Sequence, residues 1–235
     1  MSRGRDQQWV RSMSSGISDQ TSPDSTKLGG WLFRHRTAIP IPLAIALLLI
    51  PVCEAPFSWT LALGGVMLTL GGEALRLASV HRIGVISRTR SDRLGPLVTT
   101  GPFAYTRNPL YIGNVFIWMG FALTAELPSL AVIFGILLWV EYHAIVKWEE
   151  NLLESRHGVD YNAYRARVAR WVPRLGARHS VAEDPRQPVP GTDFQVRVAG
   201  TDSAGFSWRE TLFSERGTLI AIAVGYVLLW TKARF

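Results

Sequence analysis

The chain has 235 residues, of which 48% are hydrophobic and 18% are charged, and its formal net charge is +7. The apolar residues fall in long blocks, which excludes an ordinary soluble domain and predicts helices that cross a lipid bilayer. The single cysteine, Cys53, excludes an internal disulfide and is interpreted as a packed apolar side chain. A basic chain could bind nucleic acid, but basic loops anchor a membrane protein equally well, so the predicted partner is the lipid bilayer and no nucleic acid.

The first 29 residues are polar and rich in Ser, Gly, Arg and Asp. This composition cannot bury enough apolar surface to fold, so residues 1–29 are predicted to be a disordered N-terminal tail. The segment contains no apolar core and is therefore not interpreted as a cleaved signal peptide.

Five apolar blocks follow, each close to the roughly 20 residues that a helix needs to cross a bilayer. The third and the fifth are the shortest. We predict an all-α, polytopic integral membrane protein with about five transmembrane helices and a cytoplasmic helical extension. The predicted spans are residues 37–53, 59–80, 109–124, 128–146 and 217–230.

The distribution of basic residues predicts the orientation of these spans. Segments 1–36, 81–107 and 147–216 hold 22 of the 25 Lys and Arg residues, and the turns that close the first and third spans hold none. If five helices cross, the three basic segments share one side, which the positive-inside rule makes cytoplasmic. We therefore expect a cytoplasmic N-terminus in the inner (cytoplasmic) membrane of a bacterium.

The largest predicted non-membrane part follows the fourth span. Over residues 159–175 aromatic and apolar residues recur at helical spacing with arginines between them, which predicts an amphipathic helix. It could lie on the membrane surface or pack on other cytoplasmic parts. The predicted regions are a tail (1–29), a transmembrane core (30–175), a cytoplasmic linker (176–213) and a C-terminal transmembrane helix (214–235).

Two clusters at the predicted cytoplasmic edge could carry chemistry. In the first, GPFAYTRNPLYIG at residues 101–113, Asn108 suits a helix cap and Pro109 suits the first helical turn. The free N–H groups of such a helix end favour an anion, with Arg107 beside them. The alternative is a capped membrane helix with an interfacial arginine and aromatics.

The second cluster, residues 141–158, places ionisable side chains where a helix leaves the bilayer, a default position for functional groups. His143 and Glu150 share a helix face there, as do Glu149 and Arg156. A solvated helix end with paired charges is the alternative interpretation.

Within the second span, Glu73 and Arg76 could pair with each other or line a pocket. There is no P-loop, no CxxC, no HExxH and no strand followed by GxGxxG, so no metal site and no Rossmann nucleotide site are predicted.

The two clusters, in their order and spacing, carry a resemblance. The sequence reads GPFAYTRNPLYIG, then EENLL, HG, YNAY and VPRL. This resembles the isoprenylcysteine carboxyl methyltransferase family and its bacterial relatives, which are also similar to phospholipid N-methyltransferases. The resemblance covers about residues 70–175. Two positions depart from the family pattern: Asn108 replaces a histidine and cannot titrate near pH 7, and His157 replaces a phenylalanine.

The resemblance implies a transferase that uses S-adenosyl-L-methionine to methylate a lipophilic acceptor, either an isoprenylcysteine-type carboxylate or a phospholipid amine. The cofactor pocket would be closed by the segment after the fourth span. Cofactor-binding candidates are Tyr105, Arg107, Asn108, Pro109, Leu110, Tyr111, Gly113, Glu149 and Glu150. Catalytic candidates are Arg156, for an acceptor carboxylate, and His143 or Glu150, as base for an amine.

Two other functions remain open from the sequence. Similar helical folds serve NADPH-dependent reductases of sterol-like or other lipid substrates, and a membrane scaffold without enzymatic activity is a third possibility. The joint presence of both clusters on one predicted membrane side argues against the scaffold.

Overall fold

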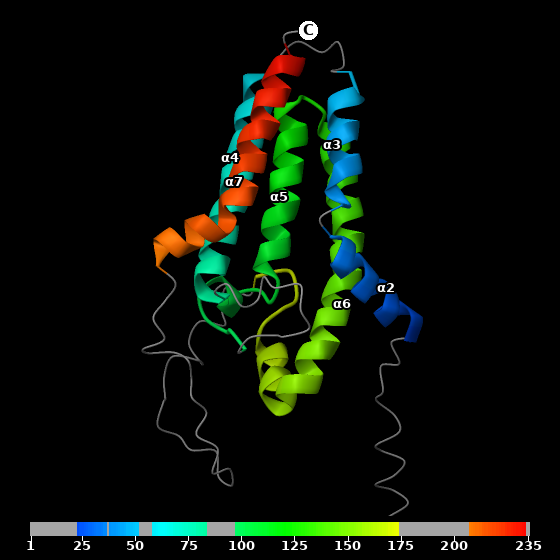
Figure 1. The fold of residues 1–235 in the computed structure, drawn as a ribbon, viewed down its shortest axis with the longest axis vertical. Coiled ribbons are helices and arrows are strands. Elements are labelled where there is room, and N and C mark those ends of the chain that lie inside the picture. The colour runs from blue at the N-terminus through cyan, green and yellow to red at the C-terminus, as the bar shows by residue number, and fades with distance from the viewer. Residues whose placement is uncertain (1–22, 37, 52–57, 84–96, 174–206, 234–235) are drawn as a thin grey trace, which may run out of the picture.

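The computed structural model describes residues 23–36, 38–51, 58–83, 97–173 and 207–233, and within them the regular elements are all helical (Figure 1). Long helices run side by side along the longest axis, and one helix, α2, projects sideways from this bundle. The elements are α2 (Pro23–His35), α3 (Pro40–Leu49), α4 (Trp59–Ile83), the 3-10 turn η2 (Gly101–Ala104), α5 (Pro109–Thr124), α6 (Pro128–Arg167) and α7 (Trp208–Lys232).

The helices confirm a membrane protein, but the prediction of five spans is not supported. Three helices of the described chain, α4, α6 and α7, are long and apolar enough to cross a bilayer. The bent pair α2–α3 would make a fourth if it counts as one span. Helix α5 begins and ends where its span was predicted, but its 16 residues extend only about 24 Å at 1.5 Å per residue. That is short of the roughly 30 Å hydrocarbon core.

The N-terminal part of the chain differs from its prediction. Helix α2 begins at Pro23, so the last seven residues of the predicted tail are helical, while residues 1–22 lie outside the described residues, as does Cys53. Gly29 and Gly30 of α2 lie directly against Ala144 and Trp148 of α6. This tertiary packing stabilises a segment whose composition alone did not predict a fold.

The C-terminal helix is also longer than predicted, because α7 begins inside the segment assigned to the linker. Ser207 and Glu210 form a capping box, in which the Glu210 carboxylate accepts from the Ser207 N–H at 3.0 Å. Such a cap satisfies backbone donors at the helix start and sets where the helix begins. The predicted linker up to residue 206 lies outside the described residues.

Glycines allow α4 and α5 to approach closely. A Cβ atom added to Gly72 would lie 2.6 Å from the carbonyl oxygen of Gly113, and one added to Gly120 would lie 2.6 Å from that of Gly65. In a bilayer, where lipid is as apolar as the helix surface, close backbone packing of small residues holds helices together.

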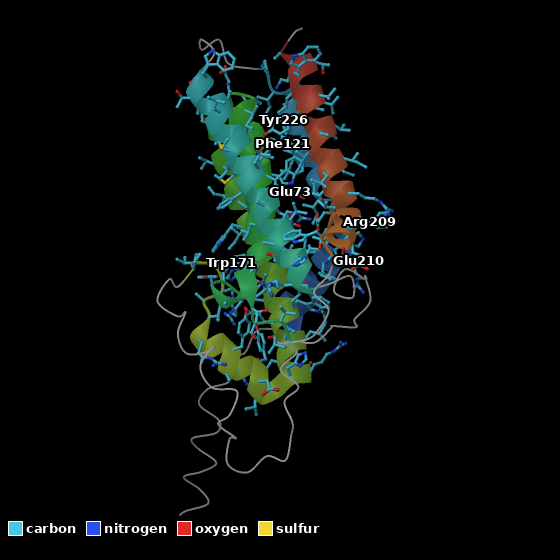
Figure 2. All side chains as sticks on the ribbon, turned by 90° about the vertical axis from the view of Figure 1, so that its left-hand side faces the viewer. Glu73, Phe121, Trp171, Arg209, Glu210 and Tyr226 are labelled. Carbon is cyan, nitrogen blue, oxygen red and sulfur yellow. The ribbon has the colours of Figure 1, made fainter. Side chains whose placement is uncertain are left out.

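Charged side chains inside the bundle connect α7 with α4 and α5. Figure 2 labels one of them, Glu73. The guanidinium of Arg76 lies 3.4 Å from Glu73 and 2.8 Å from Glu215 of α7, and it also donates to Asn114 of α5. Glu215 is fully buried. The sequence left open whether Glu73 and Arg76 pair with each other or line a pocket. The structure shows that they pair, and that Arg76 also pairs with Glu215.

Helix α6 leaves its axis at Gly158, whose φ of +45° and ψ of −111° are not helical. A positive φ is accessible to glycine at little cost. The chain turns there, and the following residues fold back toward the bundle (Figure 1). Tyr161 and Tyr164 are buried, and the Tyr164 hydroxyl donates to the Phe103 carbonyl at 2.7 Å. The predicted amphipathic helix thus packs on other parts of the protein and ends at Arg167.

We expect Gly72→Ala to destabilise the protein by about 1–3 kcal/mol, because the added methyl overpacks the α4–α5 contact. The matched control is Gly71→Ala, where nothing lies within 4 Å of the added atom. Alanine favours a helix over glycine by about 1 kcal/mol, so the control should be neutral or stabilising. Thermal unfolding in detergent, followed by circular dichroism, checks this, and equal melting temperatures for the two variants would contradict it.

Candidate functional site

The site begins at the N-terminus of α5. Asn108 occupies the cap position, but its side chain makes no capping hydrogen bond, contrary to the prediction. Instead its amide nitrogen donates to the carbonyl of Arg170 at 3.0 Å. Pro109 is buried as the first helical residue, and the neighbouring Leu110 is half-buried.

The segment that follows α6 docks beside this helix start. The Arg107 N–H donates to the Ala169 carbonyl at 2.9 Å, and the Thr106 hydroxyl donates to the Arg170 carbonyl at 3.1 Å. Residues 168–171, here called the return segment, therefore pair with residues 106–108. Trp171 of this segment lies at the foot of the bundle (Figure 2). The two predicted clusters meet here.

Glu150, on α6, connects the segment before α5 with the return segment. Its carboxylate lies 3.2 Å from Arg107 and accepts two bonds from Arg170, at 2.7 and 3.1 Å. Glu150 is only 6% exposed, so its charge is compensated by two guanidinium groups rather than by water. Arg107 also donates to the Tyr161 hydroxyl at 3.4 Å. The sequence did not predict Arg170 and Tyr161 as site residues, since both were assigned to an amphipathic helix that could lie on the membrane surface or pack on other cytoplasmic parts.

Glu149 has different surroundings from its neighbour. Its carboxylate accepts a hydrogen bond from the Tyr111 hydroxyl at 3.0 Å, and it forms no ion pair with any described residue. Burial raises the pKa of Glu149 to about 7, although the bond from Tyr111 and the charge of Arg36 both act to lower it. Glu149 lies just beyond the predicted span 128–146. It is therefore a carboxyl group poised to change charge near neutral pH.

Several buried polar atoms on Arg107, on α6 and on the return segment have no hydrogen-bond partner among the described residues. They are Arg107 Nε, His143 Nδ1, His157 Nε2 and Trp171 Nε1. The rings of His143 and Trp171 lie 6.4 Å apart. Buried polar atoms are nearly always satisfied, so a concentration of unsatisfied ones is what a polar ligand would complete.

Other predicted site residues lie elsewhere. Gly113 faces α4, because a Cβ atom there would meet the Arg76 side chain and the Gly72 carbonyl, so it serves helix packing rather than a ligand. Arg156 is exposed. Tyr105 is half-buried in the turn before α5, where its N–H donates to the Pro102 carbonyl at 3.1 Å.

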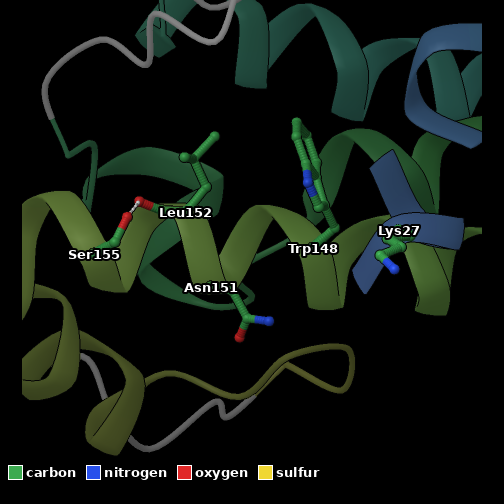
Figure 3. A pocket seen from close by; sticks show the side chains of 5 residues that line it. All are labelled: Lys27, Trp148, Asn151, Leu152 and Ser155. Carbon is green, nitrogen blue, oxygen red and sulfur yellow. Dashed lines mark hydrogen bonds between the residues drawn. The ribbon is translucent and has the colours of Figure 1, made fainter. Parts of the chain in front are cut away.

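A shallow groove of about 380 Å³ lies between α2 and α6 (Figure 3). It is lined by Lys27, Trp148, Asn151, Leu152 and Ser155. None of these is a predicted site residue, so this groove and the site around Glu150 are different places on α6.

We expect Glu150→Gln or Arg170→Gln to free the return segment, because each removes one partner of a buried ion pair, a change that costs up to about 3–5 kcal/mol. Hydrogen exchange at the Arg107 N–H, which bonds to Ala169, should accelerate at least about tenfold. Glu150→Gln should also weaken, by more than about twofold, the affinity for the cofactor that the motif resemblance implies.

The matched control is Arg165→Gln, which breaks an exposed pair with Glu154 at 3.6 Å. Exposed pairs contribute about 0–1 kcal/mol, so exchange at Arg107 should stay unchanged. Equal protection in all three variants would show that the pair does not hold the segment.

Comparison with known proteins supports the motif analysis. Residues 59–159 match the phospholipid methyltransferase family. The chain is 29% identical over 149 residues to the nickel-cobalt-cadmium resistance protein NccN of Alcaligenes xylosoxydans xylosoxydans, which covers 63% of this chain and 69% of that protein. It is 33% identical over 111 residues to the protein-S-isoprenylcysteine O-methyltransferase of Schizosaccharomyces pombe, which covers 44% of this chain and 46% of that enzyme.

The cobalt-zinc-cadmium resistance protein CzcN of Cupriavidus metallidurans is 27% identical over 154 residues, 64% of this chain and 69% of that protein. No solved structure matches. The comparisons give no support to the reductase alternative. They confirm the resemblance found in the sequence motifs: the chain is similar to the phospholipid methyltransferase family and to isoprenylcysteine methyltransferases.

Proposed function

We propose that this chain transfers a methyl group from S-adenosylmethionine to a lipophilic acceptor, an isoprenylcysteine-type carboxylate or a phospholipid amine. The observation that carries the proposal is a set of buried polar atoms on Arg107, α6 and the return segment that have no hydrogen-bond partner among the described residues, in parts of the chain that Glu150 and Asn108 hold together. The charge distribution supports a site on the cytoplasmic side of a bacterial inner membrane, with the N-terminus on that same side.

The residues present fit this cofactor. Its carboxylate would be held by Arg107, whose Nε lacks a partner among described residues, and by the N–H groups at the start of α5. Its ammonium would be held by Glu149, since Glu150 is already occupied by two arginines. His143, His157 and Trp171 offer ring nitrogens for its ribose and adenine. The cofactor supplies an electrophilic methyl group and a neutral thioether leaving group.

A carboxylate acceptor is already ionised at neutral pH, so its methylation needs no general base. The protein's residues need only align the acceptor with the methyl group and exclude water. An amine acceptor must lose a proton, and His143, whose Nδ1 has no hydrogen-bond partner in the described part of the chain, would accept it. Asn108 in place of a histidine is no obstacle to carboxylate methylation.

The test is to incubate purified full-length protein with methyl-labelled cofactor, first with a prenylated cysteine acid and then with vesicles of membrane lipid extract. Transfer to the carboxylate gives a methyl ester, which releases labelled methanol in base. Transfer to an amine gives a base-stable label. Failure to bind the cofactor, or to label any lipophilic product, would overturn the proposal.

The pKa of Glu149 makes cofactor affinity depend on pH. Because burial raises this pKa to about 7, the group is mostly neutral at pH 6 and mostly ionised at pH 8. Only the ionised form attracts the cofactor's ammonium, so affinity should rise about tenfold between those values. Glu149→Gln should bind weakly at both. Glu154→Gln, at an exposed position of the same helix, should keep the rise. Persistence of the rise in Glu149→Gln would remove Glu149 from the cofactor site.

A further inference from the structure

Arg36 lies at the break between α2 and α3. Helix α2 ends at His35, α3 begins at Pro40, and their axes differ by 59°. The guanidinium carbon of Arg36 lies 4.1 Å from the centre of the Phe33 ring. Phe33 in turn packs on Trp148, with the ring centres 4.9 Å apart. Phe33 and Trp148 thus hold the Arg36 guanidinium near α6, and Trp148 directly precedes Glu149.

The guanidinium of Arg36 has no hydrogen-bonding or ion-pair partner in the part of the chain that the structure describes. Arg36 is half-buried, and its guanidinium lies over the Phe33 ring. A guanidinium has five N–H donors in a planar fork that matches a carboxylate or a phosphate. Such a group at the boundary of a membrane-embedded bundle is a candidate for binding an anion.

Arg36 is also close enough to the site to act on it. Its positive charge lowers the pKa of Glu149, against the effect of burial, although the two groups are not paired. If Glu149 is neutralised by the ammonium of a cofactor, Arg36 is left as a nearby uncompensated positive charge. Arg156, which the sequence analysis suggested for an acceptor carboxylate, is exposed, whereas Arg36 is half-buried.

We propose, building on the methyltransferase function above, that Arg36 binds the anionic group of the lipophilic acceptor, a carboxylate or a phosphate. Arg36 lies outside residues 59–159, the part of the chain that matches the phospholipid methyltransferase family. The helix pair α2–α3 therefore contributes acceptor specificity to a site whose other residues belong to α5, α6 and the return segment.

The two anion sources have different consequences. Methylation of a carboxylate oxygen gives a neutral ester, so Arg36 would bind the substrate more tightly than the product. Methylation of a phospholipid amine leaves the phosphate charge in place, so Arg36 would hold substrate and product alike.

The experiment measures equilibrium binding to the purified full-length protein without cofactor, using two pairs of probes. Farnesylcysteine acid is compared with its uncharged methyl ester, and phosphatidylethanolamine with diacylglycerol. In at least one pair the wild type should prefer the member that carries the carboxylate or the phosphate by about tenfold. Arg36→Gln should abolish that preference, and Arg36→Lys should keep part of it. Arg34→Gln, which removes an exposed charge two residues earlier, in the last turn of α2, should leave it intact.

The pair that shows the preference identifies the anion source. Absence of any preference in the wild type, or its persistence in Arg36→Gln at an unchanged melting temperature, would overturn the proposal. Cofactor binding is measured separately in each variant, so that loss of the acceptor preference is distinguished from a change at the cofactor site. A wild type that prefers the anionic probe but binds no cofactor would refute the methyltransferase site while leaving the anion site in place.

Discussion

The buried contact of Glu150 with Arg107 and Arg170 is the interaction on which the site depends. It joins the start of α5, the long helix α6 and the return segment in one charge-compensated group. A carboxylate that is only 6% exposed would be strongly unfavourable alone, because the interior solvates charge poorly. Two guanidinium groups remove that penalty, and the backbone bonds of Thr106 and Arg107 to the return segment extend the contact.

The two adjacent glutamates show how a helix separates roles. Successive helical residues point about 100° apart, so Glu149 and Glu150 face different neighbours. Glu150 meets two arginines and becomes part of the framework, whereas Glu149 meets Tyr111 and remains without an ion pair in the described chain. The two carboxyl groups thus have different partners among the described residues, although they are adjacent in the sequence.

A second ionic group, formed by Arg76 with Glu73 and Glu215, holds the bundle that carries the site. It connects α4 with α7, and Arg76 also reaches Asn114 on α5, five residues beyond the first residue of that helix. The glycine contacts between α4 and α5 act in the same place by letting the backbones approach. The position of the α5 N-terminus therefore depends on packing and charge inside the bundle as well as on the return segment.

The sequence by itself determined the local features of this protein. The helical class followed from the length of the apolar blocks, and the limits of α5 followed from Asn108–Pro109 at one end and a short polar turn at the other. The capping pattern from Ser207 to Glu210 also predicts the start of α7, although the sequence analysis did not use it. These are local signals, because each depends on residues within a few positions of one another.

Only the tertiary structure decided which groups meet. Arg170 reaches Glu150 across 20 positions because the chain turns at Gly158, and Glu215 reaches Arg76 across 139. Tertiary packing also decided that residues 23–29 are helical and that Arg156 is exposed. It likewise decided that Gly113 packs on α4 and that Arg36 lies over Phe33. Each depends on how helices are rotated and docked, which periodicity along one segment does not specify.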